Sequence, residues 1–207
     1  RSDVGAIGGP GITPKNDPFW ARVSGAFFLS VTSGGFPERY ISCPPRRSVD
    51  DWPSVNLIVR KSVYSLIGGF DSDYWPGEDT LFCLKIIKQA KLKILYVPNL
   101  VVWHHRRSGL RKHLRQIGNY GKHRGYFVKN YPETSYRIKY YIPTLWLVFV
   151  LSGATLSSVS PWLGWTYLAG WVAYLIALIF SWKEIMRFES KTIAICATPY
   201  IFLSHLW

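Results

Sequence analysis

Residues 68–107 read GGFDSDYWPGEDTLFCLKIIKQAKLKILYVPNLVVWHHRR. The stretch joins a double glycine, an acidic pair, an apolar helical pattern, a strand pattern and two consecutive histidines. The acids and the imidazoles stand at the ends of apolar elements, which is typical of a site whose chemical groups are carried where loops meet a rigid scaffold. We therefore interpret the rest of the chain outward from this stretch.

The acidic pair Glu78-Asp79 stands where a helix is predicted to begin. Pro76-Gly77 interrupts the chain immediately before it, and the apolar pattern continues to Ala90. Both carboxylates then project from the first helical turn, where the helix dipole favours negative charge. The spacing predicts an apolar face made of Leu81, Leu84 and Ile87.

Short apolar runs on either side of this helix predict strands. Residues 55–60 and 91–97 read as strands, and 101–103 is a shorter extended piece that leads to the histidines. Residues 61–67 predict a short helix capped by Gly68-Gly69.

The first forty residues are rich in glycine and proline, and their first part predicts loops and turns. Within them, residues 27–31 fit either a short strand or the start of a helix. Asp3 and Asp17 are candidate polar contacts, although lone loop aspartates usually form turns or caps.

Composition favours a membrane-associated protein over a soluble nucleic-acid binder. The net charge is +13, 48% of the residues are hydrophobic and ten are Trp, with charge and hydrophobicity segregated along the chain. The cysteines suggest neither a disulfide framework nor a zinc site, because they are scattered without CxxC spacing. The only methionine is Met186, so we expect the chain to be part of a longer protein; no signal peptide is recognisable near its start.

The second half of the chain predicts attachment to a membrane. Residues 106–139 hold ten Lys or Arg and one acid, whereas 141–159 and 161–182 carry no charge. Each uncharged run approaches the ~20 residues that span a bilayer, so the pair predicts a transmembrane hairpin, and 192–207 begins a third apolar segment. Basic residues on both flanks place the hairpin ends on the cytoplasmic side. A buried helical hairpin of a soluble protein is the alternative.

Three pieces in this order resemble a known family: VNLIVRKSVYSLIGGFDSDYWPGEDTLFCLKI, YVPNLVVWHHRR and LRQIGNYGKHRG, followed by apolar segments. Together they resemble the C-terminal half of a membrane-anchored family 2 glycosyltransferase, over nearly the whole chain. The resemblance implies an α/β fold, the C-terminal part of a GT-A (nucleotide-diphospho-sugar transferase) domain followed by transmembrane α-helices. The implied divisions are a catalytic half (1–105), a basic amphipathic interfacial segment (106–139), a transmembrane hairpin (140–182) and a third membrane segment (192–207).

The same resemblance assigns the acids to catalysis. Asp79 is implied to be the general base that deprotonates the acceptor hydroxyl, and Glu78 to hold the acceptor or orient the base. Two acids that merely cap a helix are the alternative reading. Gly68, Gly69 and Asp71 of the GGFD loop are implied to contact substrate.

Residues downstream are implied to serve the diphosphate. His104 matches a position where a histidine completes a Mg²⁺ or Mn²⁺ site; a histidine hydrogen-bonded at a strand end is the alternative. Arg106 and Arg107, like Arg111 and Arg124, would bind the diphosphate or a lipid phosphate, or form a solvated basic collar.

Gln116 is also implied to contact substrate, because it stands where processive synthases of the family carry QxxRW. This chain has Asn119 for the Arg and Tyr120 for the Trp. The departure favours addition of single sugars over processive synthesis.

The resemblance implies an inverting hexosyltransferase that moves sugar from a nucleotide-diphospho-sugar donor to a lipid-linked or cell-envelope glycan acceptor. It implies a multi-pass cell-membrane protein with its catalytic part on the cytoplasmic side, in contact with membrane lipids and not nucleic acid. The family's Asp-x-Asp motif does not occur upstream of the GGFD loop, and Asp71-Ser72-Asp73 lies in the wrong place, so we expect this part alone to be inactive. A processive polysaccharide synthase, or a non-catalytic basic membrane protein that binds anionic lipid or nucleic acid, are the rivals.

Overall fold

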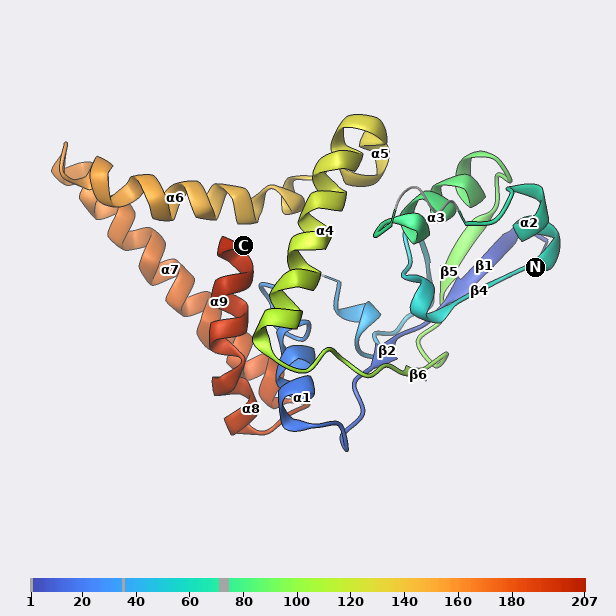
Figure 1. Cartoon of the computed structure of the whole chain (residues 1–207), viewed down its shortest axis with the longest axis horizontal. Helices are drawn as coiled ribbons and strands as arrows, with labels where there is room; N and C mark the ends of the chain where they lie inside the picture. The colour runs from blue at the N-terminus through green and yellow to red at the C-terminus, as the bar shows by residue number, and fades with distance from the viewer. Residues whose placement is uncertain (1, 35, 71–74) are drawn as a thin grey trace. The chain divides into compact units, whose positions relative to one another are not determined.

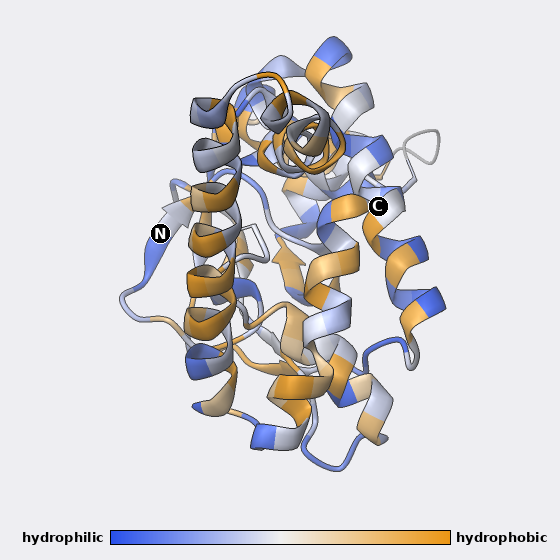
Figure 2. Ribbon diagram, turned by 90° about the vertical axis from the view of Figure 1, so that its left-hand side faces the viewer, coloured by the Kyte–Doolittle hydropathy of each residue, from blue (hydrophilic) through white to orange (hydrophobic). Residues whose placement is uncertain are grey.

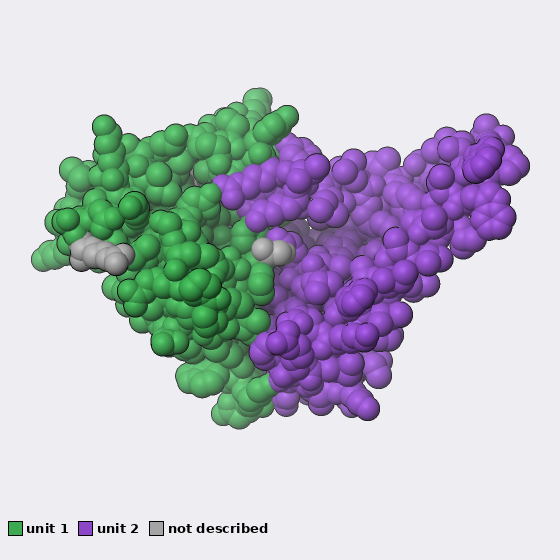
Figure 3. All heavy atoms as spheres, turned by 180° about the vertical axis from the view of Figure 1, so that it is seen from behind, with its two compact units in different colours: residues 1–17, 36–105, 119–136 green, residues 18–35, 106–118, 137–207 purple. Residues whose placement is uncertain are grey.

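The computed structural model describes residues 2–34, 36–70 and 75–207, and it is mixed α/β with two compact units (Figures 1 and 3). Unit 1 consists of Arg1–Asp17, Phe36–His105 and Asn119–Tyr136, and unit 2 of Pro18–Gly35, Arg106–Gly118 and Arg137–Trp207. The chain therefore passes between the units several times. Residues 18–35, which the sequence grouped with the catalytic half, belong to the helical unit.

Unit 1 contains a small mixed sheet in the order β3-β5-β1-β4. Its central strand β1 runs parallel to β5 and antiparallel to β4, while β3 is antiparallel to β5. A second, two-stranded parallel sheet joins β2 to β6. The strands are β1 (Val4–Gly8), β2 (Gly11–Ile12), β3 (Arg47–Val49), β4 (Leu57–Val59), β5 (Lys93–Tyr96) and β6 (Val102–Trp103).

Strand β1 overturns the prediction of loops and turns for the first part of the chain. Gly8 at its end and the following Gly9 serve close packing and not a turn. A Cβ added to Gly8 would lie 2.3 Å from Cδ1 of Trp52, and one added to Gly9 would lie 1.8 Å from the carbonyl oxygen of Leu100. A glycine-rich sequence can thus form a central strand where large side chains and backbone approach it closely.

Helices α2 (Lys61–Leu66) and α3 (Glu78–Lys88) confirm the predicted helices around the central stretch. Gly68 and Gly69 end α2 with φ values of +75° and +72°, and the Gly69 N–H donates to the Tyr64 carbonyl at 3.1 Å. The predicted apolar face of α3 is confirmed in part, because Leu81 is buried while Leu84 and Ile87 are only partly buried. The residues of α3 that join the core are Phe82, Cys83 and Ile86. The core also contains Ala6, Trp52, Val63, Ile67, Ile94 and Tyr96.

The basic segment folds mainly into α4 (Leu110–Asn130), followed by α5 (Pro132–Ser135). The C-terminal part of α4 belongs to unit 1 and its N-terminal part to unit 2. Short 3-10 turns lie at Pro37–Arg39 and Ser54–Asn56 in unit 1, and at Ile138–Tyr140 in unit 2.

Unit 2 is helical and contains α1 (Phe19–Phe27), α6 (Ile142–Ser157), α7 (Pro161–Met186), α8 (Lys191–Cys196) and α9 (Thr198–Leu206). Phe27, considered above as the start of a strand or helix, ends α1 instead. Helices α6 and α7 form a hairpin (Figure 1) in which glycines allow close approach. A Cβ on Gly153 would lie 2.2 Å from the Tyr167 ring, and one on Gly170 would lie 2.4 Å from the Phe149 ring.

Within the described residues, α7 is the one helix long and apolar enough to span a membrane; Figure 2 shows the predominance of hydrophobic residues in the helices of unit 2. It has 26 residues, and 11% of its apolar window is buried in the protein. The 16 residues of α6 extend about 24 Å, less than the ~30 Å hydrocarbon core of a bilayer. The third apolar run divides into the short helices α8 and α9.

Candidate active site around Asp79

Asp79 occupies the first turn of α3, as predicted, and its carboxylate is held by two backbone N–H groups. Thr80 N–H donates to Oδ1 at 2.8 Å, and Ser54 N–H donates to Oδ2 at 3.2 Å. The neighbouring Glu78 accepts from the Gly77 N–H at 2.9 Å. Both acids remain partly exposed, so the backbone fixes the carboxylates while leaving them accessible from solvent.

Gly77, immediately before the acids, is required by geometry. Its φ is +139°, and an added Cβ would lie 1.7 Å from Nδ1 of His123. That nitrogen donates to the carbonyl oxygen of Pro76, which accepts only, so Nδ1 carries the proton. Burial lowers the pKa of His123 and keeps the ring neutral. The His123 imidazole therefore fixes α4 against the turn at Pro76-Gly77, which precedes Glu78 and Asp79.

A second acid, Asp51, lies beside this turn in a largely buried ion cluster. Its Oδ2 accepts from Arg124 Nη2 at 2.9 Å and from Arg39 Nη2 at 3.2 Å. Its Oδ1 accepts from the Thr80 hydroxyl at 3.1 Å. The side chains of Asp51, Arg39 and Arg124 are only 12%, 14% and 17% exposed.

The arginines keep Asp51 ionised. Burial alone would raise the pKa of this carboxyl, but the guanidinium groups of Arg39 and Arg124 outweigh burial and hold the pKa well below its ordinary value. Arg124 also donates to the Ser135 hydroxyl at 3.1 Å, which fixes the guanidinium from its other side. A permanent negative charge is thereby built next to α3.

Asp79 has the opposite electrostatic character. Burial, then the charge of Asp51, and to a smaller extent that of Glu78, raise its pKa from 3.8 to about 6, although the Ser54 and Thr80 N–H groups oppose the rise. A carboxyl with such a pKa is ionised at neutral pH and is a stronger base than an ordinary aspartate. This is the property that a general base near pH 7 requires.

The remaining predicted site residues of unit 1 are placed as follows. Gly68 and Gly69 form the end of α2, and Asp71 lies outside the described residues. His104 follows β6 and is partly buried. Its backbone N–H donates to the Ile12 carbonyl at 2.8 Å. The adjacent His105 contacts the buried carboxylate of Asp17 at 2.5 Å, so Asp17 is a polar contact in the fold.

Three other predicted residues belong to unit 2. Arg106 lies over the Phe28 ring at 5.5 Å, Arg107 is exposed, and Gln116 is partly buried on α4. Near Gln116, a Cβ on Gly118 would lie 2.4 Å from Nε1 of Trp207, so this glycine admits a tryptophan against the helix.

The residues that the structure describes do not form a complete site for the predicted divalent cation. Among residues 2–34, 36–70 and 75–207, no three His, Cys, Asp or Glu side chains are grouped to hold a metal ion. His104 would supply a single ligand there, and we assign no chemical step to a metal.

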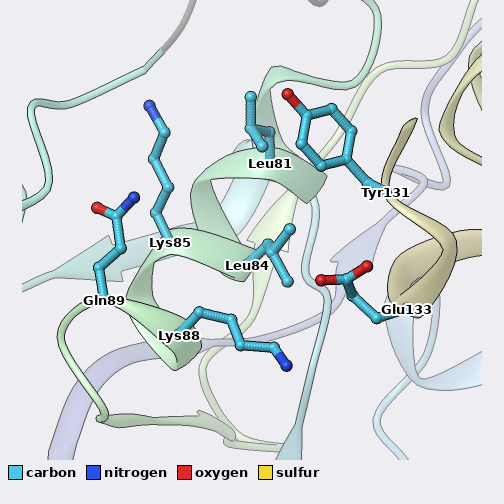
Figure 4. A pocket seen from close by; sticks show the side chains of 7 residues that line it. All are labelled: Leu81, Leu84, Lys85, Lys88, Gln89, Tyr131 and Glu133. Carbon is cyan, nitrogen blue, oxygen red and sulfur yellow. The ribbon is translucent and has the colours of Figure 1, made fainter.

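A cavity of about 340 Å³ lies beside α3 in unit 1 (Figure 4). Figure 4 shows Leu81 and Leu84 facing Tyr131 and Glu133 across it. The lining residues are Leu81, Leu84, Lys85, Lys88, Gln89, Tyr131 and Glu133. Because neither Asp79 nor Asp51 is among them, this cavity is separate from the acid cluster.

Sequence reasoning missed Asp51, Arg39 and His123, and it misread Arg124. Arg124 was expected to bind phosphate or to be part of a solvated collar, whereas it is largely buried against Asp51. The available signal was the pair Asp50-Asp51 followed by a tryptophan in an otherwise irregular stretch. That signal gives no partner, because Arg124 lies 73 residues away in the chain.

Comparison with known proteins gave no match: no family model, curated protein or solved structure matches this chain.

Proposed function

We propose that the protein is an inverting glycosyltransferase that works at a membrane, with Asp79 as its general base. The observation that carries the proposal is the state of Asp79. It is a partly exposed carboxylate, fixed by two backbone N–H groups, whose pKa is raised to about 6. The motif order described above supports the assignment to a GT-A fold and to a nucleotide-diphospho-sugar donor.

In the proposed reaction, an acceptor hydroxyl oxygen forms a bond to the anomeric carbon of the donor sugar. The bond between that carbon and the diphosphate oxygen breaks, and the hydroxyl proton passes to Asp79. Glu78 would accept a hydrogen bond from the acceptor and so orient it. Cationic donors would neutralise the departing diphosphate, since they stabilise charge that develops on a leaving group. Mg²⁺ or Mn²⁺ near His104 remains a prediction.

We propose that α6 crosses the membrane together with α7, so that the two helices form a transmembrane hairpin. Tryptophans Trp162, Trp165 and Trp182 would anchor it at the interfaces, and the basic segments on its flanks would lie on the cytoplasmic side. A lipid-linked or cell-envelope glycan acceptor would then be reached from the membrane surface. The QIGNY sequence supports addition of single sugars.

The test uses the full-length protein in native membranes, incubated with a panel of radiolabelled UDP-, GDP- and dTDP-sugars and the endogenous lipid acceptors. We expect Asp79→Asn to abolish transfer while membrane insertion is unchanged. Glu133→Gln is the matched control, because Glu133 is an exposed acid in the first turn of α5. Full transfer by the Asp79→Asn protein would remove Asp79 from the role of base. Absence of transfer by the unaltered protein with every donor of the panel would favour a non-catalytic membrane protein.

A further inference from the structure

The proposed reaction makes no use of the most elaborate feature beside Asp79, the Asp51 cluster. The partners of Asp51 come from separate parts of the chain. They are Arg39 in the Pro37–Arg39 turn, Thr80 on α3 and Arg124 on α4. Holding a charge in a largely buried place is costly unless it is fully paired. A cluster of this kind beside a candidate base therefore calls for a specific role.

Thr80 connects the two acids directly. Its backbone N–H donates to Asp79 Oδ1 at 2.8 Å, and its side-chain hydroxyl donates to Asp51 Oδ1 at 3.1 Å. Thr80 is 3% exposed, so water does not compete for these bonds. The second N–H that holds Asp79 comes from Ser54, three residues after Asp51. Both hydrogen bonds to the Asp79 carboxylate thus originate from residues tied to Asp51.

We propose that Asp51 and Thr80 are positioning residues, which fix the orientation of the Asp79 carboxylate and keep a negative charge beside it. The proposal rests on the function of Asp79 as base. Asp51 lies in the loop that carries Ser54, and it also accepts a hydrogen bond from the Thr80 hydroxyl. It thereby fixes both residues whose N–H groups hold the Asp79 carboxylate. Its charge also makes Asp79 hold a proton more tightly, which suits a base that must accept one.

The other charged and titratable groups around the acids do not replace Asp51. Glu78 is also negative but bonds the Gly77 N–H and acts on Asp79 more weakly than Asp51 does. Arg39 and Arg124 are directed at Asp51. Cys83 and His123 are neutral, because burial raises the pKa of the thiol and lowers that of the imidazole.

The first test compares Thr80→Val with Thr80→Ser in the full-length protein. Valine matches threonine in shape but lacks the hydroxyl, whereas serine keeps it; both retain the backbone N–H that bonds Asp79. We expect Thr80→Val to lower kcat about tenfold or more, with the KM of the donor sugar within about twofold, because misplacing a base affects the chemical step. Thr80→Ser should restore kcat to within about threefold of the original.

The second test is the pH profile of Asp51→Asn. Removing the negative charge should move the acid limb of kcat/KM to lower pH by about one pH unit or more, a change that a purely structural contact would not produce. Equal kcat in Thr80→Val and Thr80→Ser, or an unmoved acid limb in Asp51→Asn, would overturn the proposal. Should Asp51→Asn not fold because its arginines are left unpaired, the Thr80 pair decides alone.

Asp79→Asn separates this proposal from the one it rests on. If Asp79→Asn transfers sugar, Asp79 is not the base and both proposals fail. If Asp79→Asn is inactive while Thr80→Val matches Thr80→Ser, only the positioning role fails.

Discussion

At the residue scale, the proposed site holds two aspartates with opposite electrostatic character. Asp51 is paired with two arginines and stays ionised, whereas Asp79 is partly buried beside that charge and holds its proton up to about pH 6. Environments that push neighbouring carboxyl pKa values apart are typical of acid–base sites. Here the difference has consequences for stability as well as for chemistry.

Asp79→Asn should stabilise the fold above pH 6. In the unfolded chain the carboxyl ionises near its ordinary pKa of 3.8, but in the folded protein it does so near 6. Ionisation of Asp79 therefore destabilises the folded protein. This destabilisation is absent below pH 3.8, grows as the pH rises and is complete above pH 6. The penalty is at most about 3 kcal/mol, and the loss of one acceptor oxygen reduces the gain.

The measurement is the thermal unfolding midpoint in detergent, followed by tryptophan fluorescence across this pH range. We expect Asp79→Asn to unfold at higher temperature than the unaltered protein at pH 7, and the difference to vanish toward pH 4. Glu133→Gln should show no such pH-dependent gain. A difference in midpoint between Asp79→Asn and the unaltered protein that stays the same across the pH range would contradict a raised pKa.

Arg124→Gln should destabilise unit 1 by about 1–3 kcal/mol, because it leaves Asp51 with Arg39 as its remaining guanidinium partner in a largely buried place. Arg115→Gln, an exposed position on the same helix, should change stability by less than about 0.5 kcal/mol. Denaturant unfolding in detergent compares the two variants. Equal effects would mean that the pair with Asp51 contributes nothing specific.

The sequence was informative about the acids but not about their surroundings. Glu78 and Asp79 were placed correctly at the start of α3, because a turn followed by an apolar helical pattern is a local signal. Asp51 was not identified, since its role depends on Arg124, which is 73 residues away in the chain. Long-range pairing of buried charges leaves no periodicity that a single sequence reveals.

At the element scale, local sequence signals predicted α2 and α3, whereas β1 depends on packing with distant parts of the chain and was not predicted. The ends of both helices follow local rules, with Gly68-Gly69 at one and Pro76-Gly77 at the other. Strand β1 was missed because Gly8 and the following Gly9 read as turn residues, although they leave room for Trp52 and Leu100. Glycines selected for packing and glycines selected for turns look alike in sequence.

Gly77→Ala should damage unit 1 much more than Gly68→Ala. Both glycines have positive φ, but only Gly77 faces a clash, with His123, while a Cβ on Gly68 meets nothing within 4 Å. Gly68→Ala should therefore cost about 1 kcal/mol from backbone strain alone. The thermal unfolding midpoints of the two variants give the comparison.

A double variant isolates the clash. Combining Gly77→Ala with His123→Ala should destabilise less than the sum of the single changes, because removing the imidazole frees the space that the new methyl group needs. Strictly additive midpoints would show that His123 does not pack against Gly77.

At the scale of the whole molecule, the proposal requires that the helices of unit 2 lie in a membrane. Helix α7 has the length and composition for this, while α6 has 16 residues and the last apolar run forms two short helices. The uncharged runs in the sequence predicted apolar helices correctly. They did not predict where helices end, because the break between α8 and α9 leaves the sequence apolar on both sides.

Cysteine labelling in intact cells tests the predicted orientation. Cys43 and Cys196 are first replaced by alanine, while the buried Cys83 is kept. We expect Ser158→Cys, at the hairpin turn, to react with a membrane-impermeant maleimide from outside. Arg187→Cys, after α7, should react only in permeabilised cells. If both react only after permeabilisation, the hairpin does not cross the membrane and the alternative of a soluble helical hairpin is favoured.

The pH dependence of sugar transfer tests the central claim, that Asp79 is the base, most directly. It is measured as kcat/KM of the full-length protein from roughly pH 5 to pH 8. We expect kcat/KM to fall on the acid side with an apparent pKa of about 6, the value that burial and Asp51 give to Asp79, and Asp79→Asn to abolish transfer. A profile without an acid limb in this range, or the same limb in the Asp79→Asn protein, would contradict it.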